Sequence, residues 1–349
     1  MIKVQDNAIV DVDLVAARHY DNLIAPINAD GVNYHATSSL IGRIKTRRNI
    51  DNTAAFNDRV RFWDYFLGNN YKNLKRVITG RPGVLKQIIN EISSGFGINF
   101  LCNSVNYEQA SLNDFGKIVK HVFAYKALYR DHPECEANCR DLNLVYCPYC
   151  NENLIPVIVR TSGLTGKQAD MALLQIDHFY PRSRHPYLGL SFFNLIPGCS
   201  PCNAYLKGEK DFNIDHHFNP FHKRFDDFYN FEISNIKPKN LGEIKITYKE
   251  KFASNSTDQA LKDFEIIQRY EQSHKRALYK LVNKINNHSP RYSLGVKRQF
   301  PFIFVLPDTS IDDILENQDV PMHKNEINHH AIGKLKRDIC TQLGIKLPG

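Results

Sequence analysis

Two cysteine pairs with the same spacing carry the strongest chemical signal in this chain. Cys147 and Cys150 form one Cys-x-x-Cys pair, and Cys199 and Cys202 form a second pair about fifty residues later. Zinc favours four thiolate or imidazole ligands in a tetrahedron, and two such pairs supply them with little strain. A redox-active dithiol needs only one pair. We therefore expect a structural zinc site, with four incidental buried thiols as the alternative.

The other four cysteines give a weaker signal. Cys135 and Cys139 have a spacing that metal sites use, but no second pair remains to complete a site with them. Cys102 and Cys340 are isolated in the sequence. We assign all four to structural roles or leave them unassigned.

Groups that could do catalysis lie between and beside the cysteine pairs. Asp177 and His178 are adjacent, Asn194 follows, and Asn203 comes directly after the last cysteine. Zinc held by four thiolates has no open position, so any chemistry must happen elsewhere. An imidazole can accept a proton near neutral pH, and carboxylate and amide oxygens suit magnesium. A lone Asp-His pair is more often structural than catalytic. His216, His217 and His222 are interpreted as surface or core histidines.

The elements that must position these groups follow from local patterns. Residues 154–160 and 172–179 are apolar and β-branched, and the turn-prone residues 161–167 separate them. This pattern predicts a β-hairpin whose second strand ends at Asp177 and His178. Successive residues on a strand face opposite sides, so these two side chains serve different tasks unless the strand ends between them. Residues 203–210 could begin a helix.

The flanking regions read as mainly helical. Apolar residues recur at helical spacing over residues 84–92 and 115–128, and again over residues 261–285. We therefore divide the chain into a mainly helical region (1–130), a central region rich in cysteine and histidine (131–225), and a mainly helical C-terminal region (226–349) that also holds two short strands. The expected fold class is α+β.

Composition is that of an ordinary globular protein, with 349 residues, 42% of them hydrophobic, and a net charge of +8. No run of about 18 apolar residues could span a membrane, and the N-terminus lacks the apolar core of a signal peptide. We therefore expect a cytoplasmic protein with reduced cysteines. A basic charge is compatible with a nucleic-acid partner without establishing one. Basic clusters near residues 43–48 and 72–76 are more often solvated helix faces than phosphate-binding surfaces.

Taken in order, the residues described above carry a resemblance. Asp177-His178-Phe179-Tyr180-Pro181, Asn194-Leu195-Ile196-Pro197 and Cys199-Ser200-Pro201-Cys202-Asn203 resemble the HNH endonuclease motif. The two cysteine pairs resemble the zinc-stabilised subgroup of that family. The resemblance covers about residues 145–212 and implies a central ββα-metal core. The third motif position, histidine in the family name, is Asn203 here, and asparagine occurs there in many members.

The resemblance implies roles for these residues. His178 would be the general base that activates water, and Asp177 and Asn203 would hold one magnesium or manganese ion on the scissile phosphate. Asn194 would fix the loop and orient His178. The product ends would be a 5′-phosphate and a 3′-hydroxyl. Four nearby basic residues would contact the nucleic-acid backbone: Arg182, Arg184, Lys207 and Lys210.

A narrower resemblance extends beyond the motif. Residues 142–151, 185–190 and 269–275 are similar to HNH nucleases of bacterial anti-phage systems of the Septu type, some of which accompany a retron. That resemblance implies an ATPase protein partner and a role in antiviral defence. DNA is the favoured substrate. The alternatives are a nuclease that cleaves RNA such as tRNA, and a non-catalytic zinc module that binds nucleic acid or protein.

Overall fold

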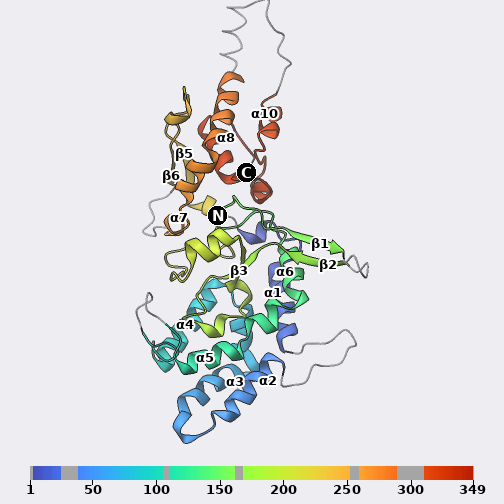
Figure 1. Ribbon diagram of the computed structural model, residues 1–349, viewed down its shortest axis with the longest axis vertical. Coiled ribbons are helices and arrows are strands. Elements are labelled where there is room, and N and C mark those ends of the chain that lie inside the picture. Colours follow the sequence, from blue (N-terminus) through green and yellow to red (C-terminus); the bar gives the residue numbers. More distant parts are fainter. Residues whose placement is uncertain are drawn as a thin grey trace, which may run out of the picture.

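The computed structural model describes residues 3–24, 38–104, 111–161, 168–251, 259–288 and 310–348. The molecule is elongated, with the N-terminal helices at one end and the C-terminal elements at the other (Figure 1). Three two-stranded antiparallel sheets accompany the helices in the described residues. The central strand β3 (Gln175–His178) lies near the middle of the long axis (Figure 1). The expected mixture of helices and small sheets is confirmed.

Local sequence explains where the N-terminal helices begin. The Ser39 hydroxyl accepts a hydrogen bond from the Gly42 amide at 3.0 Å, and the Asn113 side chain accepts one from Gly116 at 2.8 Å. Such caps satisfy amides that the first turn leaves unpaired. The helices are α1 (Val12–Ile24), α2 (Leu40–Ile50), α3 (Asn57–Thr79), α4 (Pro82–Phe96), α5 (Asp114–Val122) and α6 (Pro133–Leu142).

An aromatic core joins these helices to the central region. Phe62 of α3 is fully buried, and its ring packs edge-on against Phe115 of α5 at 5.5 Å. The Phe62 ring also packs against the ring of Tyr187, with the two centroids 6.3 Å apart. Tyr187 follows the Asp-His pair in the chain. Edge-to-face packing at these centroid distances is favourable for aromatic rings. The N-terminal helices therefore support the segment that carries the candidate catalytic residues.

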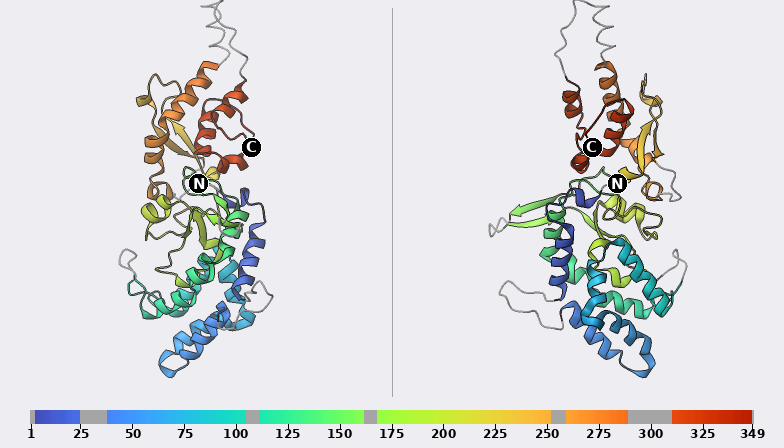
Figure 2. Two further views of the ribbon diagram at one scale, coloured as in Figure 1. Left: turned by 45° about the vertical axis from the view of Figure 1, so that its right-hand side comes forward. Right: turned by 180° about the vertical axis from the view of Figure 1, so that it is seen from behind.

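The central strands differ in part from the expected hairpin. Strand β1 (Val157–Thr161) pairs with β2 (Gln168–Ala172), and this hairpin projects from the body of the molecule (Figure 2). The predicted pairing of residues 154–160 with residues 172–179 is therefore wrong, because most of the predicted second strand forms β3, which pairs with β4 (Leu195–Gly198). Burial explains the difference. All four residues of β4 are buried, whereas β1 is mostly exposed.

A helical segment, Pro201–Lys207, follows β4 directly and contacts β3. Asp177 pairs with Ile196 and His178 pairs with Leu195 in the β3–β4 register. The order is therefore strand, strand and helical segment, with the Asp-His pair on the first strand. The helical segment begins two residues before Asn203 and ends at Lys207.

The C-terminal region contains a third hairpin and four α-helices in its described part. Glu265 has a positive φ of 50° between two of the helices, which breaks the predicted helix over residues 261–285 into two pieces. These elements are β5 (Tyr229–Ile233), β6 (Ile246–Glu250), α7 (Ala260–Asp263), α8 (Ile266–His288), α10 (Ile311–Asn317) and α11 (Gly333–Gln342).

One buried hydrophobic cluster includes residues from all three sequence regions, from Val4 to Ile339. The division at residues 130 and 225 stays a prediction. No helix in the described ranges is both long and apolar enough to cross a membrane.

Candidate functional site

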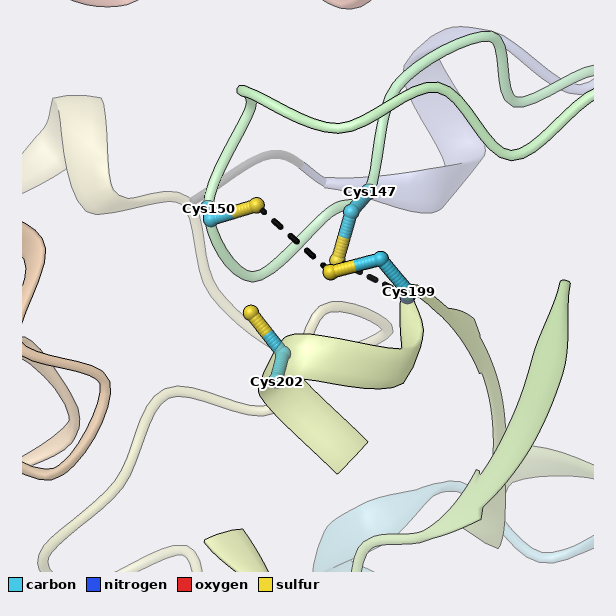
Figure 3. Close-up of side chains that lie close together, drawn as sticks. All are labelled: Cys147, Cys150, Cys199 and Cys202. Carbon is cyan, nitrogen blue, oxygen red and sulfur yellow. Dashed lines mark hydrogen bonds between the residues drawn. The ribbon is translucent and has the colours of Figure 1, made fainter. Parts of the chain in front are cut away.

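The four predicted cysteines meet at one point in the fold. The Sγ atoms of Cys147, Cys150, Cys199 and Cys202 all lie within 4.8 Å of one another, and all four residues are buried (Figure 3). In the described part of the chain this is the only group of three or more Cys, His, Asp or Glu side chains arranged to hold a metal ion. The group could hold zinc, because its donors are four soft sulfur atoms and it is closed to solvent.

Local backbone hydrogen bonds shape the tight turn within each Cys-x-x-Cys pair, which we call a knuckle. The Asn151 amide donates to the Cys147 carbonyl at 2.7 Å, and the Asn203 amide donates to the Cys199 carbonyl at 3.0 Å. Asn151 adopts a left-handed conformation with φ of 51°. Asparagine tolerates that region better than most residues, and its side chain is anchored by the Ile327 carbonyl at 3.1 Å. The sequence therefore turns tightly enough to aim both thiols of the first pair inward.

Hydrogen bonds also reach the sulfur atoms. The Cys199 amide lies 3.4 Å from Cys147 Sγ (Figure 3), and Asn153 Nδ2 lies 3.4 Å from Cys199 Sγ. Donors of this kind favour the thiolate, which is the form that binds metal.

Side chains of helix α8, in the C-terminal region, contact the four-cysteine site. Arg269 Nη1 lies 3.4 Å from Cys202 Sγ, and its Nη2 pairs with Glu152 at 2.5 Å. His274 contacts the other oxygen of Glu152 at 3.0 Å, and the Tyr270 hydroxyl donates to the Cys150 carbonyl. Four thiolates around Zn²⁺ carry a net charge of −2, so the Arg269 guanidinium offsets part of it. Sequence reasoning noted this segment only through the narrower resemblance and assigned it no contact.

Asp177 is buried, and both of its oxygens are bonded. Lys207 Nζ lies 2.7 Å from Oδ1, and the Tyr149 hydroxyl donates to Oδ2 at 2.6 Å. Burial raises the pKa of Tyr149 well above its usual value, so this hydroxyl stays protonated and donates. Tyr149 sits inside the first cysteine knuckle, between Cys147 and Cys150. Tyr149 therefore connects the Asp177 carboxylate to the four-cysteine group, and the HNH motif assigned no role to this tyrosine.

His178 lies on the opposite face of β3 with its ring in a defined tautomer. Its Nε2 is 3.0 Å from the Gly189 carbonyl. A carbonyl only accepts, so Nε2 carries the proton, and Nδ1 is the basic atom of the neutral ring. Burial, and then the charge of Arg182, hold the pKa of His178 well below its usual value. The imidazole is therefore unprotonated at neutral pH.

Tyr125 supports this histidine from the N-terminal region. The two rings meet edge-on with centroids 4.6 Å apart. The Arg182 guanidinium lies 4.9 Å from the centre of the Tyr125 ring on which it stacks. Tyr125 is 53 positions before His178, and no pattern in the sequence connects the two.

The asparagines occupy different positions in the site. Asn194 is fully buried, its Oδ1 accepts from the Tyr180 amide at 2.7 Å, and its Nδ2 donates to the Leu188 carbonyl at 3.2 Å. It therefore fixes the loop between β3 and β4, which also carries the Gly189 carbonyl. Asn203 is half-buried and donates to Gln175 Oε1 at 3.0 Å. This contact places it beside the face of β3 that carries Asp177.

Three of the four basic residues expected to contact phosphate are bonded to other groups of the protein. Lys207 is buried against Asp177, and it also donates to the His178 carbonyl at 2.5 Å. Arg184 is buried and donates to the Ser104 carbonyl at 2.5 Å. Lys210 is exposed but pairs with Asp263 at 2.9 Å. The expectation of a surface role for Lys207 and Arg184 is therefore corrected, because their apolar stems and charged ends both lie inside the fold. Arg182 lies close enough to His178 for its charge to lower the pKa of the imidazole.

The predicted magnesium ligands do not form an open cation site. The Asp177 carboxylate already faces an ammonium group at 2.7 Å, and a divalent ion bound to the same oxygens would be repelled by it. Asn203 by itself offers one amide oxygen. As arranged, these residues do not fit a magnesium or manganese ion.

The comparisons with known proteins identify no relative of this chain: no family model, curated protein or solved structure matches it.

Proposed function

We propose that this protein is an HNH-type endonuclease that hydrolyses phosphodiester bonds of nucleic acid. One observation carries the proposal. The β3–β4 hairpin and the helical segment after it place Asp177, His178, Asn194 and Asn203 around one short strand, against a buried four-cysteine group. The order of two strands and a helical segment beside a four-cysteine group supports the proposal, because the resemblance to the ββα-metal core implies that order.

His178 is the general base in this proposal. Its Nε2 proton is held by the Gly189 carbonyl, so Nδ1 takes the proton from a water whose oxygen bonds to phosphorus. The bond from phosphorus to the 3′-oxygen breaks, and that oxygen takes up a proton from solvent and leaves as the 3′-hydroxyl. The lowered pKa keeps Nδ1 unprotonated at neutral pH. Asn194 holds the loop that carries Gly189, and Tyr125 restricts the rotation of the ring. Arg182, whose charge lowers the pKa of His178, would contact a phosphate oxygen.

Dependence on magnesium or manganese belongs to the proposal as well. A divalent ion would supply positive charge to the phosphate and to the leaving oxygen. Because Asp177 is paired with Lys207, we derive no catalytic step through such an ion.

Duplex DNA is the favoured substrate, and the net charge of +8 supports a polyanionic partner. A role in antiviral defence beside an ATPase partner rests on the resemblance alone. RNA is the alternative substrate.

A second function is favoured by one observation. Both oxygens of Asp177 accept a hydrogen bond, one from Lys207 and the other from Tyr149, as those of a structural carboxylate would. That contact supports a non-catalytic zinc module that binds nucleic acid or protein.

Cleavage of plasmid DNA and of total cellular RNA tests the two functions. The assay compares wild type with His178→Ala, and with His216→Ala as a control at an exposed histidine, in magnesium, in manganese and in EDTA. Zinc content is measured for every variant, so that a folding defect is recognised. We expect wild type and His216→Ala to cut and His178→Ala to lose cutting by at least about 100-fold. Full activity of His178→Ala would refute the proposed base. Binding without cutting, equal in all three proteins, would favour the zinc module.

A further inference from the structure

Lys207 is an unusual residue for a nucleic-acid contact, because its charge is directed into the protein. Its side chain is 2% exposed, and that of Asp177 is 4% exposed. The ammonium bridges the Asp177 carboxylate and the His178 carbonyl, at 2.7 Å and 2.5 Å. It therefore contacts both residues of the Asp-His pair, one through its side chain and the other through its backbone.

The cysteine group fixes the position of Lys207. The helical segment begins beside Cys202 and ends at Lys207, and the next residue, Gly208, has a positive φ of 51° that terminates it. The ammonium also lies 5.1 Å from the centre of the Phe212 ring, a favourable contact for a cation. The lysine therefore reaches Asp177 from a segment with little freedom to move.

Each oxygen of the Asp177 carboxylate has a strong donor. One oxygen accepts from Lys207 and the other from Tyr149, a hydroxyl held inside the first cysteine knuckle. A buried carboxylate needs a compensating charge, and Lys207 supplies it. A divalent cation on the same oxygens would need the lysine to withdraw, which would leave the lysine buried without its partner.

We propose that Lys207 is the resident cation of Asp177, and that it excludes divalent ions from this carboxylate in the substrate-free protein. Asp177 is then a positioning residue: with Lys207 it joins β3 to the cysteine-anchored helical segment and holds the backbone of His178. The inference concerns the site of the proposed function, and it assigns that site's carboxylate a partner other than magnesium.

Binding of Mn²⁺, followed by electron paramagnetic resonance on the full-length protein loaded with zinc, tests this inference. We expect wild type and Asp177→Asn to bind Mn²⁺ equally weakly. Lys207→Met removes the ammonium but keeps much of the side-chain volume, and it should tighten Mn²⁺ binding by at least about tenfold. The double variant Lys207→Met/Asp177→Asn should lose that gain. Lys262→Met, at an exposed lysine, is the control and should resemble wild type.

Two results would overturn the inference. Wild type that binds Mn²⁺ at least about tenfold more tightly than Asp177→Asn would make Asp177 a ligand despite Lys207. A folded Lys207→Met that gains no affinity would show that the lysine excludes nothing.

If Lys207→Met does not fold, crystals of the wild-type protein soaked in Mn²⁺ decide the question. An anomalous peak at coordinating distance from Asp177 overturns the inference, and its absence there supports it. These measurements report ion binding and not cleavage, so failure of the proposed nuclease in the His178→Ala assay stays distinguishable from failure of this inference.

Discussion

The hydrogen bond from Tyr149 to Asp177 offers a sharp test of how the cysteine site supports the candidate catalytic strand. Tyr149→Phe removes only the hydroxyl, which donates to Asp177 Oδ2 at 2.6 Å. The aromatic ring remains, with its packing against Phe264 at a centroid distance of 4.7 Å. Both Tyr149 and Asp177 are buried, so water cannot replace the lost donor without a rearrangement.

The expected magnitude follows from the charge of the acceptor. Hydrogen bonds to charged groups contribute about 1.5–3 kcal/mol, so Tyr149→Phe should lower the free energy of unfolding by about 2 kcal/mol. Urea unfolding followed by far-UV circular dichroism, at a fixed excess of zinc, measures this loss. Tyr205→Phe is the matched control, because Tyr205 is 81% exposed, and it should change stability by less than about 0.5 kcal/mol.

A double-mutant cycle assigns the loss to this contact. In Tyr149→Phe/Asp177→Asn the two effects should be less than additive, with a coupling of at least about 1 kcal/mol. A Tyr149→Phe protein as stable as the Tyr205→Phe control, or a cycle with no coupling, would refute the reasoning.

Two further predictions concern the cysteine group and pH. Cys147→Ser should lose the bound zinc, measured by elemental analysis, and unfold around residues 145–212, because metal binding there contributes folding free energy; a normally folded, zinc-free variant would contradict this. The pKa of His185 is lowered to about 3, by burial first and by Arg184 second. His185 therefore binds a proton more readily in the unfolded chain than in the folded protein. The contribution of neutral His185 to the free energy of unfolding is fully present above pH 6.5 and is lost as the pH falls toward 3. At pH 5 the loss in the free energy of unfolding amounts to about 2 kcal/mol. In His185→Gln the midpoint of urea unfolding should therefore change less between pH 6.5 and pH 5 than it does in wild type. The same pH dependence of the midpoint in both proteins would refute this prediction.

The helical spacing of apolar residues predicted where several helices lie but not where each of them ends. The apolar stripe over residues 84–92 became α4, and the stripe over residues 261–285 became α7 and α8. The break between the last two lies at Glu265, whose left-handed backbone no local signal marks. The stripe over 115–128 likewise ends as a helix at Val122. Helix ends depend on the packing of the next segment, which a local window does not contain.

The sequence by itself determined the four-cysteine group, because two Cys-x-x-Cys pairs carry their geometry within the chain. It also determined which residues flank that group and the turn-forming character of the knuckles. Tertiary structure alone decided that β3 pairs with β4 and that Lys207 and Tyr149 share Asp177. It also placed Tyr125 against His178. The physical reason is the same in each case. Burial and charge compensation join residues that are distant in sequence, so the environment of a carboxylate or an imidazole is known only when the chain is folded.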